Sequence, residues 1–239
     1  MSQQMRKALD LNTLVAKQYQ QKKTVSKAVK AANAEAKQTM NDVRVLFNLQ
    51  LARVYQAATH KKAVIDCQKM METYVGNRQF VRVAISVLTD KSLIVASSSV
   101  MSKALHAALF GYLGEKFKKT LIDPLDKPPS CQKTYDRILA FLTGTFFNEP
   151  SEEIAKGCAI SMKEILENVF PEFLEPGQEG NFDATFISPL RGVLQATGSN
   201  KNAIASASFC MRYLIQHLIK NHPHMVDAKM AQRFAKLAI

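Results

Sequence analysis

Residues 41–75 read NDVRVLFNLQLARVYQAATHKKAVIDCQKMMETYV. Apolar side chains recur at helical spacing on both sides of a short polar break at residues 59–62, a pattern typical of two amphipathic helices joined by a turn. The apolar positions are Val43, Leu46, Phe47, Leu51, Val54 and Tyr55 before the break, and Val64, Cys67, Met71, Tyr74 and Val75 after it. The segment therefore predicts one antiparallel helical hairpin.

Comparable segments follow along the rest of the chain. Residues 81–87 alternate between apolar and polar side chains as a strand would, but the neighbouring helices favour a helix there. Further hairpins are expected at about 79–121, 130–169 and 184–218, and a last helix follows Pro223.

The spacing of these hairpins indicates the fold class. They begin near residues 41, 79, 130, 184 and 225, and two of the intervals approach the roughly 40 to 47 residues of HEAT and armadillo repeats. We therefore predict an all-α protein in which residues 38–239 form a short α-solenoid of about four to five antiparallel HEAT/ARM-like helix pairs. Residues 1–37 are rich in Ala, Gln and Lys with few apolar positions, so they predict a separate basic, polar helical arm.

Composition excludes several classes of protein. The 239 residues are 47% hydrophobic and 22% charged, as in an ordinary globular chain. No window approaches the roughly 18 apolar residues of a membrane-spanning helix, and the polar start lacks a secretory apolar region. Cys67, Cys131, Cys158 and Cys210 lie far apart without a CxxC pair, which argues against a zinc site and favours reduced core thiols. We expect a cytosolic or nuclear protein.

The chain is strongly basic, with 32 Lys and Arg against 20 Asp and Glu and a net charge of +12. Such an excess favours an acidic partner, either nucleic acid, an anionic membrane or an acidic protein surface, although lysines also simply solvate helix faces. Aromatic residues fall on the buried stripes, so specific nucleic-acid binding is not expected, whereas a non-specific phosphate contact by the arm stays open. The arm lacks a bulky apolar face, and no membrane binding is expected.

Motifs of enzyme chemistry are missing from the sequence. GxxxxGK[ST], GxGxxG, HExxH and GxSxG do not occur, so the phosphate-binding, dinucleotide, zincin and hydrolase interpretations lack their local geometry. His222 and His224 flank Pro223 without a Cys or carboxylate nearby in sequence, which is a weak metal signal. Glu152 and Glu153 fit the first turn of a helix better than acid–base work. We expect a non-enzymatic protein without a catalytic residue, cofactor or metal.

A resemblance narrows the function. Phe186–Leu194 (FISPLRGVL), Asn200–Asn202 (NKN) and Ala205–Cys210 (ASASFC) are similar to a hairpin of the microtubule-associated HEAT proteins of the TORTIFOLIA/SPIRAL2 type. Ala155–Ala159 (AKGCA) resembles the small-residue helix of the preceding repeat. The resemblance implies a TOG-like helical paddle in the cytoplasm, associated with the cytoskeleton, that binds tubulin or the microtubule lattice through the turns inside each helix pair.

The same resemblance assigns the partner-binding residues to those turns. The third turn, Phe147–Pro150, departs because it is acidic, and the chain has no Trp for the first turn of a typical TOG array. Both departures weaken binding of soluble tubulin more than binding of the lattice. The assigned residues are His60, Lys61, Lys62, Lys91, Asn200 and Lys201, beside Thr59, Asp90, Ser199 and Asn202.

Two alternatives remain open. An armadillo-like scaffold or transport adaptor would hold an extended peptide on its concave face, and its binding would depend on Asn202 or Arg212. General nucleic-acid association would instead depend on residues 1–37.

Overall fold

The computed structural model describes residues 38–56, 58–117, 130–196, 198 and 200–226. Over these residues the secondary structure is helical without a strand, which confirms the all-α class. The chain divides into two compact units, Met1–Val45 and Leu46–Ile239, and the boundary falls inside a helix over residues 38–54. In the first unit, the side-chain amide of Gln38 donates a hydrogen bond of 3.2 Å to the carboxylate of Asp42. The arm expected at residues 1–37 and the last helix expected at residues 227–239 lie outside the described residues.

The second unit is built from helices of eight to about twenty residues with shorter elements between them. Residues 81–87, which also alternate like a strand, are helical. The elements are α2 (His60–Thr73), α3 (Arg78–Leu88), α4 (Ser92–Val95), α5 (Val100–Phe117), α6 (Ser130–Thr145), α7 (Glu152–Val169), α8 (Glu179–Phe182), α9 (Ser188–Gln195) and α10 (Lys201–Asn221), with single turns at Phe146–Asn148, Pro171–Leu174, Asp183–Ile187 and Pro223–Met225.

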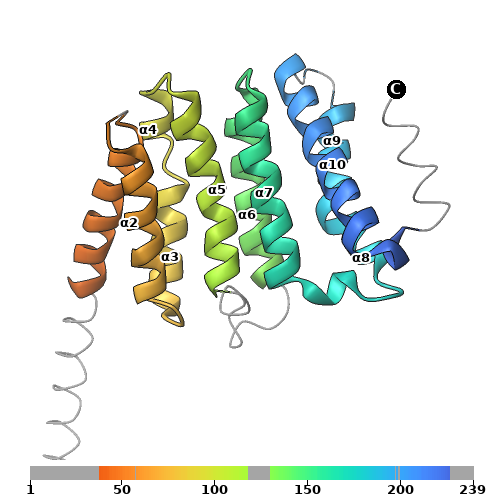
Figure 1. Cartoon of the computed structure of the whole chain (residues 1–239), viewed down its shortest axis with the longest axis horizontal. Coiled ribbons are helices and arrows are strands. Elements are labelled where there is room, and N and C mark those ends of the chain that lie inside the picture. Colours follow the sequence, from red (N-terminus) through yellow and green to blue (C-terminus); the bar gives the residue numbers. More distant parts are fainter. Residues whose placement is uncertain (1–37, 57, 118–129, 197, 199, 227–239) are drawn as a thin grey trace, which may run out of the picture. The chain divides into compact units, whose positions relative to one another are not determined.

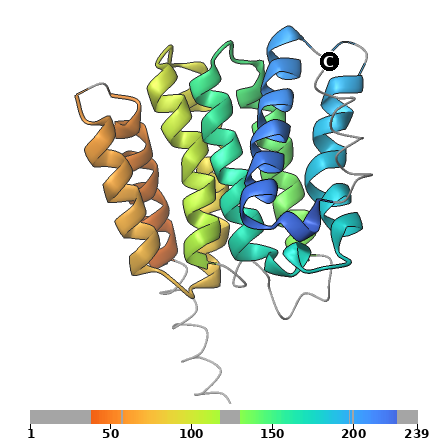
Figure 2. The same cartoon turned by 45° about the vertical axis from the view of Figure 1, so that its right-hand side comes forward.

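Two layers of helices make up this unit. Helices α2, α5, α7 and α10 lie next to one another in that order, and α3, α6 and α9 lie behind them (Figure 1). Each helix of the first layer follows a helix of the opposite direction, so all four run the same way, as the turned view also shows (Figure 2). The turns that precede α2, α5, α7 and α10 therefore lie along one edge, which we call the turn edge.

Side-chain caps begin three of the helices. The side-chain oxygen of Asn77 accepts hydrogen bonds from the backbone N–H groups of Gln79 and Phe80 at 3.0 and 3.1 Å. Asn200 accepts from the N–H of Ala203 at 2.7 Å, and the Ser151 hydroxyl similarly caps α7. These short polar residues satisfy N–H groups that a helix start leaves without partners.

Small residues bring α5 and α7 unusually close. A Cβ atom on Gly157 of α7 would lie 2.5 Å from the backbone oxygen of Ala104 on α5. The hydroxyl of Ser161 donates to the carbonyl of Ala107 at 2.5 Å and accepts from the N–H of Gly111 at 2.9 Å. It thus bridges two backbone groups that would bond directly in a regular helix. The two helices pack backbone to backbone.

The core consists mainly of phenylalanine and aliphatic side chains from both layers. Phe47, Leu51 and Val54 of the first predicted stripe are buried, whereas Leu46 is 53% exposed. The prediction that Leu46 is a core residue is therefore wrong, because Leu46 lies beside the face that Phe47, Leu51 and Val54 share at helical spacing. Fully buried aromatic residues include Phe80, Phe110, Phe146, Phe147, Phe182 and Phe186.

The cysteines that the structure describes are core residues. Cys67, Cys158 and Cys210 are buried and unpaired, as the sequence predicts. Burial raises the pKa of each of the three thiols, for Cys67 to about 12. The thiol of Cys210 lies 3.5 Å from the carbonyl oxygen of Ala155, so this residue packs α10 against α7.

Candidate functional site

The turn edge carries four exposed lysines. Lys61 and Lys62 lie in the first turn of α2, Lys91 directly precedes α4, and Lys201 is the first residue of α10. His60, at the start of α2, is half-buried. The lysines assigned to the turns by sequence therefore lie along the same side of the second unit (Figure 1).

Asn200, the remaining assigned residue, has a structural role. Besides capping α10, its side-chain amide donates a hydrogen bond of 2.8 Å to the side-chain oxygen of Asn148. The side-chain amide of Asn202 donates to the backbone oxygen of Asn148 at 3.1 Å. These contacts join the acidic third turn to the fourth turn, which carries Lys201.

An internal cation offsets the acidic third turn. The Nζ of Lys103 lies 2.6 Å from Oε1 of Glu149, and the Lys103 side chain is only 8% exposed. In the second turn, Asp90 accepts a hydrogen bond from the N–H of Ser92 at 2.9 Å. Both carboxylates are thus engaged within the protein, whereas the lysines of the edge point into solvent.

A buried histidine holds the first two turns together. The hydroxyl of Tyr55 lies 2.6 Å from Nδ1 of His106, and Nε2 of His106 lies 2.9 Å from the carbonyl oxygen of Leu88. A neutral ring that accepts from Tyr55 and donates to Leu88 satisfies both contacts. Burial lowers the pKa of His106 to about 4, so the ring is neutral at pH 7. The end of the first helix, the end of α3 and the middle of α5 meet at this residue.

A groove of about 250 Å³ lies between the starts of α7 and α10. Its lining combines the acidic side chains Glu149 and Glu152 with Phe209 and Arg212 of α10. Arg212 is exposed and Phe209 is half-buried. Asn202 and Arg212, the two residues on which the peptide-scaffold alternative depends, both border this groove.

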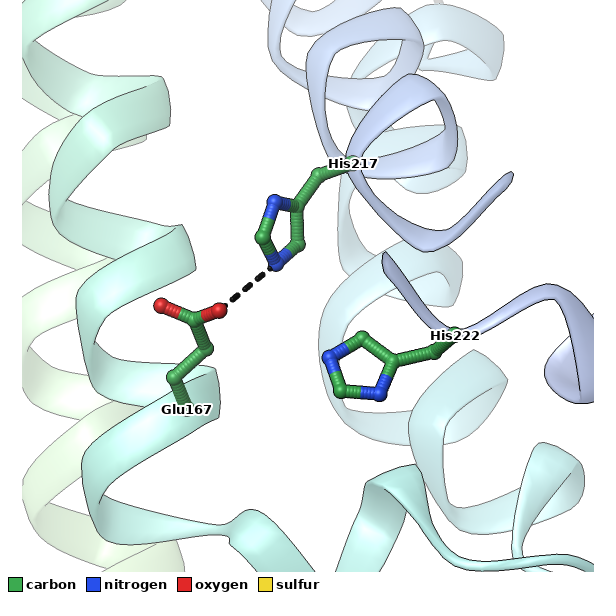
Figure 3. Close-up of side chains that lie close together, drawn as sticks. All are labelled: Glu167, His217 and His222. Atoms are coloured by element: carbon green, nitrogen blue, oxygen red, sulfur yellow. Dashed lines mark ion pairs between the residues drawn. The ribbon is translucent and has the colours of Figure 1, made fainter. Parts of the chain in front are cut away.

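A second group of polar side chains lies at the edge opposite the turn edge. Glu167 comes from the last turn of α7, His217 lies four residues before the end of α10, and His222 follows α10 directly (Figure 3). The Nε2 of His217 lies 2.9 Å from Oε1 of Glu167. Burial lowers the pKa of His217 despite the nearby carboxylate. We call these three residues the His–Glu cluster.

Sequence reasoning missed this cluster. His222 and His224 have no carboxylate nearby in sequence, and Glu167 lies 55 residues before His222, on the preceding long helix. A signal in the sequence is that Glu167 and His217 each lie near the end of the second helix of a pair. Such positions come together when consecutive pairs stack in register.

Comparison with known proteins returned no matching family model, no matching curated protein and no matching solved structure. Within the described ranges, none of the helices is both long enough and apolar enough to cross a lipid bilayer.

Proposed function

We propose that the protein is a non-enzymatic binding module in which the helix pairs form a short α-solenoid of the HEAT/armadillo type. Its turn edge associates with tubulin or the microtubule lattice in the cytoplasm. The observation that carries the proposal is the alignment of the turns on one edge, with Lys61, Lys62, Lys91 and Lys201 exposed along it.

The physical basis is attraction between exposed charges. Lysines in short turns can meet an acidic surface without leaving water, so they avoid the desolvation cost of a buried ion pair. The pairing of Glu149 with Lys103 supports the proposal because it offsets the negative charge of the third turn from inside. Binding of this type depends strongly on ionic strength.

Co-sedimentation with stabilised microtubules tests the proposal. We expect the full chain to pellet with microtubules at low salt and to be released as the salt concentration rises. The Lys61→Glu, Lys62→Glu, Lys201→Glu variant should remain in the supernatant, because three attractive charges on the edge become repulsive.

A variant of equal net charge serves as the control. Lys69, Lys156 and Lys220 are exposed, and none of them lies in a turn that precedes α2, α5, α7 or α10, so Lys69→Glu, Lys156→Glu, Lys220→Glu should leave most of the pelleting intact. If both triple variants lose pelleting equally, the binding depends on net charge and not on the turn edge. If the unmodified protein stays in the supernatant at low salt, the proposal is refuted.

The groove between α7 and α10 favours a second candidate, the binding of an extended peptide. Its acidic walls, the aromatic ring of Phe209 and the guanidinium of Arg212 offer charged and apolar contacts within one segment of chain. Peptides selected for binding to the full chain should no longer bind the Arg212→Glu variant. They should still bind the turn-edge triple variant. Selection of peptides that bind both variants equally would reject the groove.

A further inference from the structure

The His–Glu cluster has the composition of a metal site. Each of Glu167, His217 and His222 offers one ligand atom, and these three atoms all lie within 4.8 Å of one another. The side chains come from two different helix pairs and point toward a common space (Figure 3). None of the three is used by the turn edge or by the groove.

We propose that Glu167, His217 and His222 bind a divalent transition-metal ion of the Zn²⁺ class. Two imidazoles and one carboxylate form a ligand set typical of zinc sites that leave one position open. Hard cations such as Mg²⁺ and Ca²⁺ prefer oxygen ligands and would not gain from the two imidazoles.

Only small movements separate the present geometry from a bound one. Ligand atoms of a tetrahedral zinc site lie about 3.4 Å apart, given bonds of about 2.1 Å. The Glu167 and His217 atoms lie 2.9 Å apart, and an ion between them would part them slightly. His222 closes the set by rotation of its side chain, because its backbone is held at the end of α10, where its N–H donates to the carbonyl oxygen of Leu218 at 2.7 Å.

The buried nitrogen of His217 supports the assignment. Its Nε2 is shielded from solvent and lacks a well-aligned hydrogen bond, although Oε1 of Glu167 lies 2.9 Å away. Such a nitrogen has lost its hydrogen bond to water on folding and has not gained a well-aligned hydrogen bond within the protein in its place. The side-chain amide of Asn221 lies 2.9 Å from Nδ1 of the same ring. The same amide donates to the backbone oxygen of His217 at 3.1 Å. An ion at Nε2 puts the ring proton on Nδ1, so the Asn221 amide would have to move when the ion binds.

Neighbouring charges orient the carboxylate. The Nζ of Lys163 lies 3.3 Å from Oε2 of Glu167, which leaves Oε1 directed at His217. Lys163 also pairs with Glu164 at 2.6 Å, so a second carboxylate offsets its positive charge. The two carboxylates outweigh the single ammonium of Lys163, so the net charge around Glu167 stays negative and favours a bound cation.

A hollow of about 440 Å³ gives access to the cluster. Glu167 and His222 line it together with His224 and Glu175. The Nε2 of His224 is held by the carbonyl oxygen of Leu174 at 2.8 Å, so a water molecule from the hollow is the natural fourth ligand. The bound ion would connect the ends of α7 and α10.

Zinc titration of the full chain, freed of metal by a chelator, tests the proposal. Isothermal titration calorimetry should show one Zn²⁺ per chain, and Zn²⁺ should raise the unfolding temperature by mass action. His222→Asn and Glu167→Gln should each weaken the affinity by about tenfold or more. His60→Asn removes a half-buried histidine at the turn edge and should bind Zn²⁺ like the unmodified protein.

Circular dichroism of the metal-free variants separates loss of a ligand from loss of fold. Unchanged helicity with weakened binding supports the site. No saturable binding to the unmodified protein, unchanged affinity in both cluster variants, or equal weakening by His60→Asn would overturn it. Microtubule co-sedimentation tests binding at the turn edge, which lies opposite the His–Glu cluster. The outcome of the zinc titration and the outcome of the co-sedimentation are therefore independent of each other.

Discussion

Lys103 and Glu149 form an ion pair with 2.6 Å between Nζ and Oε1, although 46 residues separate them in the chain. Lys103 lies in the first turn of α5 and is almost fully buried, and Glu149 lies in the turn before α7. The pair thus fastens the start of one long helix to the turn that begins the next. A buried ammonium needs such a partner because isolated burial of a charge is costly.

Glu149→Gln is expected to lower the free energy of unfolding by about 2 kcal/mol, because Lys103 then stays buried without a counter-charge. This value is below the range for a fully buried pair because Glu149 is partly exposed. Lys103→Met with Glu149→Gln should recover part of the loss. Urea unfolding of the single and double variants measures the coupling, and purely additive effects would contradict it.

Gly157→Ala should lower the free energy of unfolding by about 1–3 kcal/mol, because the added Cβ would lie 2.5 Å from the backbone oxygen of Ala104. The effect should appear even though Ala is the better helix former by roughly 1 kcal/mol. Gly192→Ala is the matched control, since a Cβ on Gly192 of α9 meets nothing within 4 Å. Thermal unfolding should move down for the first variant and slightly up for the second; equal shifts would disprove the close contact.

Acid should destabilise the fold through His106. The pKa of its ring is lowered from 6.5 to about 4 by burial, so between these values the unfolded chain binds a proton that the folded protein does not. The free energy of unfolding should therefore fall as the pH drops from about 6.5 to about 4, by about 1.4 kcal/mol per pH unit from this residue.

Comparison with His106→Gln isolates this contribution, because glutamine keeps a donor and an acceptor but does not titrate. Denaturant unfolding at pH 7 and pH 5 should show a smaller pH dependence for the variant than for the unmodified chain. Equal pH dependence would mean that His106 titrates normally in the folded state.

Thiol labelling checks the burial of the cysteines. Cys67, Cys158 and Cys210 are buried with raised pKa values, so few thiolates form at pH 8 and reagents cannot reach them. Iodoacetamide should modify all three rapidly in denaturant and only slowly in the native protein. Mass spectrometry of the digested protein assigns each site, and rapid native labelling of Cys158 or Cys210 would contradict the packing of α10 on α7.

The helices were predictable because their signal is local. Phe47, Leu51 and Val54 follow the helical period, and that period alone identifies their face. The helical period does not show whether a residue at the margin of the apolar stripe is buried or exposed. Leu46 lies at that margin and is exposed. The caps Asn77 and Asn200 are equally local, since their residue types favour helix starts.

Contacts between helix pairs were not predictable from one sequence. Glu167 reaches His217, and Glu149 reaches Lys103, only because the pairs are placed side by side. The apolar periodicity of a single helix carries no information on how neighbouring helix pairs are placed. The small residues of α7 are visible in the sequence, but the partner that Gly157 meets, the backbone of Ala104, appears only in the structure.

The shared direction of α2, α5, α7 and α10 has an electrostatic consequence. Peptide dipoles align along a helix and leave about half a positive charge at its start and half a negative charge at its end. Four helices that start at one edge therefore add positive potential where Lys61, Lys62 and Lys201 are exposed. Their ends add negative potential where Glu167, His217 and His222 meet. The helices behind them run the other way, so this polarity belongs to the layer that α2, α5, α7 and α10 form.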